Sequence, residues 1–160
     1  MHNRIDFNHS GVIKKHFLMK SRVRAAVNRT LKYEKIHVPC TVSVLFTDND
    51  GIKEINRQFR NVDSATDVLS FPANEFMPGE FDPETCEFDH TSGRYVLGDI
   101  VISIPKCEQQ GHDFGHSVYK EVEYLTVHSM LHLLGYDHVD EGKMKKQMRN
   151  REKMIMGEIT

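Results

Sequence analysis

The chain has 160 residues, of which 28% are charged and 39% hydrophobic, and its formal net charge is −2. This mixture is typical of a globular protein and excludes a disordered chain, and the length fits one domain that spans residues 1–160. The apolar runs are too short for a membrane span and no apolar core follows the first residues, so we expect a cytoplasmic protein without a membrane partner.

The N-terminal half predicts two strands and two helices. Residues 4–7 alternate and predict a short strand, and residues 11–35 have apolar side chains at helical spacing. Residues 41–47 are rich in Val and Thr and end at the sequence Asp-Asn-Asp-Gly of residues 48–51, which predicts a strand followed by a turn. A helix is expected over residues 52–59.

The first of these helices belongs to a strongly basic segment. Residues 14–35 contain eight Lys and Arg residues and one acidic residue, Glu34. A basic stripe of this kind can follow a phosphate backbone. A solvated helix face explains it equally simply and is the more common case, so charge alone does not decide between the two.

The C-terminal half predicts two strands and three helices. The strands end at Pro72 and Pro105 and flank residues 73–94, an acidic segment that predicts a long loop or hairpin. Glycines within residues 111–115 interrupt the helical pattern, and Ser117 predicts the N-cap of the next helix. The predicted elements are residues 68–71, 96–104, 105–110, 117–135 and 140–156. Together the elements predict an α+β fold, with helices packed on a four-stranded mixed sheet.

Three histidines near the C-terminus have the spacing of a metal site. His128 and His132 lie one helical turn apart on the same face, so both imidazoles can reach one ion at ~2.0–2.1 Å. Gly135 can end the helix in a left-handed conformation, and the chain then returns to deliver His138. Three protein ligands leave a fourth position open for water, which is typical of a catalytic zinc site. We therefore predict one Zn²⁺ per chain, bound by His128, His132 and His138.

The three cysteines do not predict a second metal site. Cys40, Cys86 and Cys107 are widely spaced and form no CxxC pair, so we expect free thiols.

The histidine spacing also matches the HExxHxxGxxH motif of the metzincin peptidases, with one exception. Ser129 stands where those enzymes have the glutamate that acts as general base. A serine hydroxyl cannot accept a proton from zinc-bound water as a carboxylate does. A zinc metallopeptidase is therefore a disfavoured alternative.

Residues 127–138 instead resemble the motif of the YbeY family, which runs approximately H-G-x-L-H-L-x-G-Y-D-H. Residues 56–60 with 66–72, and then residues 97–102, resemble two further blocks of that family in the same order. The resemblance extends over about residues 41–140. The clearest departure is Ser129, where the family usually has glycine.

The resemblance implies a zincin-like architecture with the metal-binding helix across one face of the sheet. It also implies a metal-dependent endoribonuclease that favours single-stranded RNA and acts in ribosomal RNA maturation and ribosome quality control. Its partners would be single-stranded RNA, above all ribosomal RNA, and the ribosome or ribosomal proteins.

One catalytic residue follows from the same resemblance. The family's arginine before the TDVLSFP strand falls on Arg60, whose guanidinium can bind phosphate oxygens bidentately. Without the family match, a surface salt bridge would explain Arg60 as well.

Several points stay open at the level of sequence. Asp137 can either orient an imidazole as a hydrogen-bond acceptor or cap the turn. The nucleophile can be water or the RNA 2′-hydroxyl. A non-catalytic, zinc-stabilised factor associated with the ribosome also stays possible, because a fourth ligand from elsewhere would make the metal structural.

Overall fold

A five-stranded mixed sheet forms the centre of the protein. The computed structural model describes residues 1–11, 16–137 and 142–157. Four of its strands lie in the order β1 (Arg4–His9), β2 (Cys40–Thr47), β5 (Arg94–Ser103) and β3 (Val68–Pro72). The first three run parallel, whereas β3 runs antiparallel to β5 at one edge. The short strand β4 (Phe88–Asp89) also pairs with β5.

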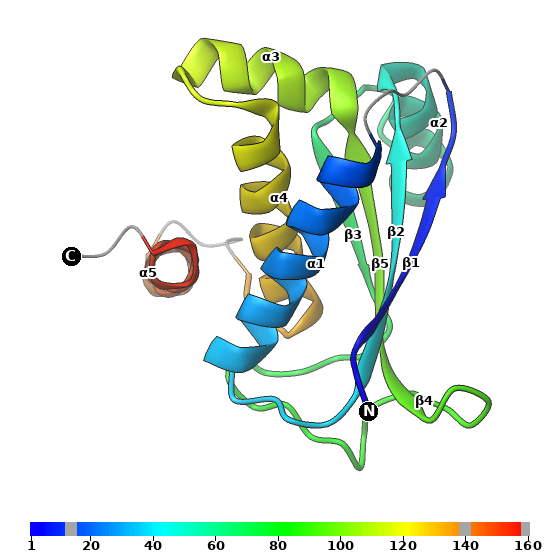
Figure 1. Cartoon of the computed structure of the whole chain (residues 1–160), viewed down its shortest axis with the longest axis vertical. Coiled ribbons are helices and arrows are strands. Elements are labelled where there is room, and N and C mark those ends of the chain that lie inside the picture. The colour runs from blue at the N-terminus through cyan, green and yellow to red at the C-terminus, as the bar shows by residue number, and fades with distance from the viewer. Residues whose placement is uncertain (12–15, 138–141, 158–160) are drawn as a thin grey trace.

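The described part of the chain also contains five helices. They are α1 (His16–Tyr33), α2 (Asn49–Arg60), α3 (Ile104–Phe114), α4 (Val118–Leu133) and α5 (Lys143–Met156). The helices α1 and α4 lie side by side over one face of the sheet, and α2 lies on the opposite side (Figure 1). The predicted α+β class, the mixed sheet and the position of the histidine helix are confirmed. No helix in the described part of the chain is long and apolar enough to cross a membrane.

The two faces of the sheet bury different parts of the core, because side chains alternate along a strand. Val42, Val44 and Phe46 of β2 point toward α1 and α4, and they belong to the main core. On the other face, Leu69 and Val101 pack against Ile52 of α2 in a smaller cluster. The main core therefore fixes α4 firmly against the sheet, and α4 carries the histidine pair.

The sheet differs from the prediction by one strand. Four strands were expected, and β4 is the fifth. It arises because part of the acidic segment after β3 folds back as a hairpin, in which Asp89 pairs with Arg94 and Gly93 takes a positive φ of 70°. The hairpin that the sequence allowed is thus present, but a two-residue strand is too short to leave a periodic signal.

Two helix boundaries also differ from the prediction. The expected turn at residues 48–51 is the first turn of α2, because an Asp48 side-chain oxygen accepts a hydrogen bond from Gly51 N at 2.8 Å and so caps the helix. The helix α3 continues through Gly111 and ends at Gly115. A Cβ on Gly111 would lie 2.8 Å from the carbonyl oxygen of His116, so glycine here permits a close return of the chain.

The end of α4 confirms the predicted glycine turn. Gly135 has a φ of 101°, and Tyr136 N donates to Leu131 O at 3.0 Å. A Cβ at Gly135 would overlap the carbonyl oxygen of Phe76, in the segment that follows β3. The glycine therefore lets the helix end and this segment approach each other closely.

We predict that Gly135→Ala lowers the free energy of unfolding more than Gly115→Ala does. Both positions have positive φ, but an added Cβ at Gly115 meets no atom within 4 Å. The difference between the two losses should be about 1–3 kcal/mol, the usual cost of overpacking. Urea unfolding of both variants measures it, and equal losses would show that the contact with Phe76 does not matter.

Candidate metal centre

The helix α4 brings the two predicted ligands His128 and His132 together. Ser117 caps its N-terminus by accepting a hydrogen bond from Lys120 N at 3.2 Å, as predicted. The two imidazole rings cross at 80° with their centroids 4.7 Å apart, and their Nε2 atoms are separated by 3.2 Å. Both side chains are partly exposed, whereas the helix residues around them are buried.

Hydrogen bonds at the opposite nitrogens orient the two rings. His128 Nδ1 lies 2.6 Å from Glu152 Oε1, and His132 Nδ1 lies 3.0 Å from the carbonyl oxygen of Tyr136. When each Nδ1 carries the proton that it donates, each Nε2 keeps a lone pair that can bind a metal ion. Two nitrogens bound to one tetrahedral zinc at 2.0–2.1 Å would be roughly 3.3 Å apart. The observed separation therefore fits a shared metal ion.

The third predicted ligand, His138, lies outside the described residues. Within the described part of the chain, no group of three or more potential metal-binding side chains occurs. The structure thus brings together two of the three predicted ligands, and the third stays a prediction. Asp137 lines the cleft beside them, and Glu152 and Tyr136 each provide an acceptor for one of these two imidazoles.

Glu152 of α5 is the residue of this site that the sequence reasoning missed. Its side chain is 8% exposed, and its second carboxylate oxygen accepts a hydrogen bond from Tyr124 Oη at 2.8 Å. Burial alone would raise the pKa of Glu152, but the hydrogen bond and charge of His128, together with Tyr124, lower it below its usual value. Burial and the adjacent Glu152 also raise the pKa of Tyr124, which keeps the hydroxyl a donor.

A signal for Glu152 was present in the sequence. It lies four residues after Met148 and three before Ile155, both of which are buried, so it belongs to the apolar side of α5. A carboxylate on the buried side of a helix requires a partner, because an unpaired buried charge is costly. The sequence could indicate that a partner exists, but not that it is His128.

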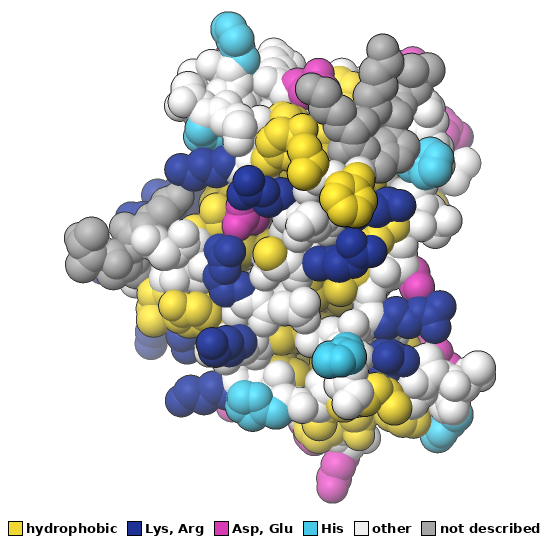
Figure 2. Space-filling view, in the orientation of Figure 1, with side chains coloured by type: hydrophobic (Ala, Val, Ile, Leu, Met, Phe, Trp, Pro, Cys, Tyr) yellow, Lys and Arg dark blue, Asp and Glu magenta, His cyan; other side chains and the backbone are white. Residues whose placement is uncertain are grey.

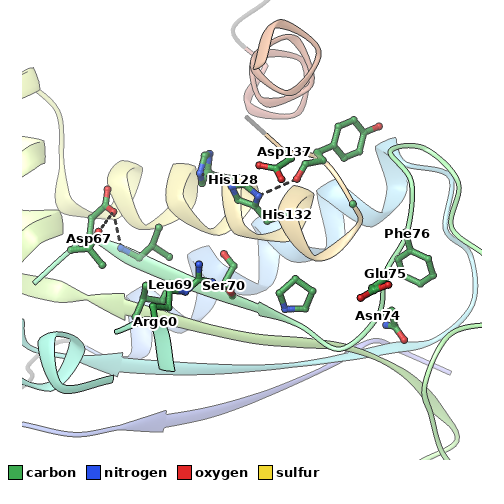
Figure 3. A pocket seen from close by; sticks show the side chains of 15 residues that line it. Arg60, Asp67, Leu69, Ser70, Asn74, Glu75, Phe76, His128, His132 and Asp137 are labelled. Carbon is green, nitrogen blue, oxygen red and sulfur yellow. Dashed lines mark hydrogen bonds between the residues drawn. The ribbon is translucent and has the colours of Figure 1, made fainter. Parts of the chain in front are cut away.

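The histidine pair opens into a cleft of about 670 Å³ between α4 and β3. Figure 3 shows His128 and His132 on one wall and Arg60, Leu69 and Ser70 on the other. The segment after β3 closes one end of the cleft. The site therefore combines a pair of nitrogen donors with a cation on the facing wall.

Arg60, the last residue of α2, is held at this wall by two contacts. Its Nη2 donates to the carbonyl oxygen of Ser70 at 2.5 Å, and its guanidinium lies 5.2 Å from the centre of the Phe71 ring. A guanidinium has five N–H groups, so this single hydrogen bond leaves donors that can bind an anion in the cleft. The predicted arginine and the histidine pair thus line the same cleft, although they are far apart in the sequence.

Ser129 follows His128 on α4 but is not among the residues that line the cleft. Its side chain is fully buried, and among the described residues its hydroxyl finds no hydrogen-bond partner. A buried hydroxyl cannot serve as the general base that the glutamate of a zinc peptidase provides at this position, which disfavours that class.

The three cysteines are free, as predicted, and all three are buried. Burial, followed by the neighbouring Cys86, raises the pKa of Cys40 to about 12, and burial raises the pKa of Cys86 to about 11. Because thiolates are the form that binds zinc, neither residue is suited to a metal site.

Fold and site together define an α+β protein in which a helix on a mixed sheet presents a histidine pair to a cleft. Comparisons with known proteins identify it further. The family model described as "Endoribonuclease YbeY" matches residues 4–160, so the chain belongs to the YbeY family. The protein named Endoribonuclease YbeY from Clostridium kluyveri is 49% identical over 140 residues, which cover 84% of this chain and 85% of that protein.

Two further comparisons agree with this family assignment. The protein of the same name from Clostridium botulinum strain Hall is 44% identical over 155 residues, or 93% of either chain. The solution structure of TM1509 from Thermotoga maritima is similar to the present structure with a TM-score of 0.56 and 27% identity, covering 99% of this chain and 91% of that one.

We predict that Glu152→Gln weakens zinc binding about 10–100-fold, because the neutral amide no longer stabilises the ligand imidazole of His128. Competition with a chromophoric chelator measures the affinity. Tyr124→Phe, which removes only the outer hydrogen bond, should have a smaller effect in the same direction. Glu54→Gln on the exposed side of α2 is the matched charge control. An unchanged zinc affinity in Glu152→Gln would refute the orienting role.

Proposed function

We propose that this protein is a zinc-dependent endoribonuclease that cleaves single-stranded RNA and acts in ribosomal RNA maturation and ribosome quality control. The observation that carries this proposal is the cleft in which the Nε2 atoms of His128 and His132 face Arg60. Membership of the YbeY family and the names of the relatives support the nuclease activity. The proposal extends to a cytoplasmic location and to the ribosome or ribosomal proteins as partners.

The histidines supply the metal ligands in this proposal. His128 and His132 would hold one Zn²⁺ through Nε2, with His138 as the third ligand. When bound, the metal supplies a Lewis acid that polarises a water or a phosphate oxygen. Glu152 and the Tyr136 carbonyl keep both imidazoles in the tautomer that exposes Nε2 to the cleft.

Arg60 has the second role in the proposed reaction. A guanidinium can donate two parallel hydrogen bonds to a phosphate. Such donors stabilise the negative charge that builds up on the phosphate oxygens in the transition state. The contacts with Ser70 and Phe71 hold the guanidinium in place before the substrate arrives.

We predict that Arg60→Ala lowers kcat for RNA cleavage on the order of 10²–10³-fold, the usual effect of removing one transition-state donor. Zinc content and thermal midpoint should stay near those of the wild type, because the side chain is exposed and is no metal ligand. Arg57→Ala is the matched control, since Arg57 is an exposed arginine one turn earlier that pairs with Glu54. It should retain almost full activity. Undiminished cleavage by a zinc-loaded Arg60→Ala variant would contradict the role of Arg60.

The substrate class is tested with the wild-type protein. We expect cleavage of a single-stranded RNA oligonucleotide and none of casein, because Ser129 provides no general base and does not line the cleft. His132→Ala should abolish cleavage. If that variant still cleaved RNA at the rate of the wild type, the reaction would not depend on this site, and a contaminating nuclease would be the source.

The same assay identifies the nucleophile. Products with 2′,3′-cyclic phosphate ends would show attack by the RNA 2′-hydroxyl. Cleavage of an all-deoxy strand would exclude that route and leave water as the nucleophile.

A further inference from the structure

Positive charge is concentrated on two helices of this protein. Of its 21 Lys and Arg residues, five lie on α1 and six on α5, and these two helices contain only one acidic residue, the buried Glu152. The remainder of the chain therefore holds 10 basic and 22 acidic residues. A net charge of −2 conceals this separation.

The two basic helices adjoin each other. Arg29 of α1 donates to the carbonyl oxygen of Ile155 in α5 at 3.3 Å, and Arg151 of α5 lies 3.7 Å from Glu34, just after α1. Figure 2 shows Lys and Arg side chains spread over the face of the molecule on which α1 lies, with few acidic groups between them. We call the exposed parts of α1 and α5 the α1–α5 basic face, with Lys20, Arg24, Lys32, Lys146 and Lys153 as its members.

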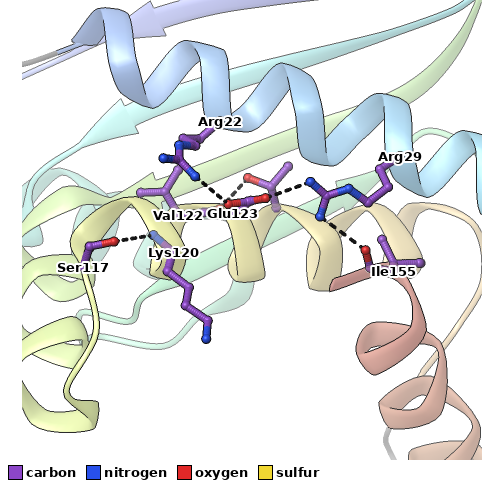
Figure 4. A network of polar contacts seen from close by, with 8 residues as sticks. Arg22, Arg29, Ser117, Lys120, Val122, Glu123 and Ile155 are labelled. Atoms are coloured by element: carbon purple, nitrogen blue, oxygen red, sulfur yellow. Dashed lines mark hydrogen bonds and ion pairs between the residues drawn. The ribbon is translucent and has the colours of Figure 1, made fainter. Parts of the chain in front are cut away.

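Two arginines of α1 form ion pairs with another helix of the protein. Arg22 and Arg29 donate to Glu123 of α4 at 3.3 and 3.0 Å, and they fasten α1 to α4 (Figure 4). The members of the basic face differ from these two. Among the described residues, no carboxylate lies within ion-pair distance of Lys20, Arg24 or Lys32. Lys20 and Arg24 instead extend over the ring of Phe7, at 5.6 and 5.0 Å from its centre.

The stability of the two helices does not account for the like charges in this arrangement. Lys20 and Arg24 are four residues apart on α1, as are Arg149 and Lys153 on α5, and like charges at this spacing destabilise a helix. A surface that serves only for solubility usually mixes charges of both signs. A face that keeps one sign over two helices is suited to a partner of the opposite sign.

We propose that the α1–α5 basic face binds the phosphate backbone of RNA outside the cleft. This proposal rests on the proposed function, because that function makes RNA the ligand. Lys20 and Lys32 are separated by ~18 Å along α1, enough to contact several successive phosphates. Long, flexible cationic side chains bind phosphates without reading the base sequence. The face would therefore add affinity for long RNA without choosing the bond that is cleaved.

The helix α5 links this face to the cleft. Glu152 on its buried side contacts His128, while Ile155 near its end contacts Arg29 of α1. In this proposal, an RNA strand whose scissile phosphate lies at the histidine pair continues past α5 onto α1. A short oligonucleotide confined to the cleft would not reach α1.

The test replaces three cations of the face in the variant Lys20→Gln/Arg24→Gln/Lys32→Gln. Glutamine keeps helix propensity while it removes charge. The control Lys53→Gln/Arg57→Gln/Lys106→Gln removes the same charge from α2 and α3. Binding of a long RNA with duplex and single-stranded parts is measured as a function of salt in a His132→Ala background, which prevents cleavage. Circular dichroism checks that both variants are folded.

The face variant should bind the long RNA on the order of 100-fold more weakly at 0.1 M salt, and the slope of log K against log salt should fall by about 2. The control should change neither quantity. With an intact active site, the face variant should cleave a short single-stranded oligonucleotide at the wild-type rate. Arg24→Lys, which keeps the charge, should bind long RNA almost as the wild type does.

Equal RNA affinity and salt slope in the face variant and the wild type would overturn the proposal. So would a loss in the face variant of binding to anionic vesicles, or to an acidic protein, without a loss of RNA binding. If the wild type bound long RNA through this face but cleaved no RNA at all, the proposed reaction would fail while the binding surface would stand.

Discussion

The hydrogen bond between Glu152 and His128 joins the last helix to the candidate metal centre. The carboxylate is buried on the apolar side of α5, where it needs a donor, and the imidazole of His128 and the hydroxyl of Tyr124 provide two. This contact fixes one nitrogen of the imidazole and thereby turns the other toward the cleft. The same contact anchors α5, so that the positive charge of that helix lies next to the site.

The sheet supplies the second constraint on the site. The apolar side of α4 packs into the main core, which leaves His128 and His132 at its margin facing β3. Because β3 is an antiparallel edge strand that follows α2, it brings the end of α2 and Arg60 to the opposite wall. The cleft is thus the space between one helix and one edge strand, and a cation and a pair of donors face each other across it.

Much of this fold could be predicted from periodicity and from single residues with strong local preferences. The longer strands, the cap at Ser117 and the left-handed Gly135 each depend on interactions within a few residues, which a sequence displays directly. The histidine pair is likewise local, because its two members are one turn apart. The strand β4 and the start of α2 were missed, because a two-residue strand and a side-chain cap resemble ordinary turn sequences.

The remaining parts of the site depend on contacts between distant segments. Glu152 reaches His128 across 24 residues, and no local pattern indicates which residue a buried carboxylate will meet. Arg60 was predicted only through the family resemblance, and its place in the cleft follows from the pairing of β3 with β5. The basic segment was visible in the sequence, but its continuation onto α5 appears only when the two helices adjoin.

Reconstitution of the metal-free protein is the sharpest test of a catalytic zinc ion at the histidine pair. Zinc is removed with a chelator, returned in measured steps, and both bound metal and cleavage of single-stranded RNA are followed. We predict that activity is absent at first, rises in proportion to bound zinc and reaches its maximum at one ion per chain. Full RNA cleavage by protein without metal would contradict it.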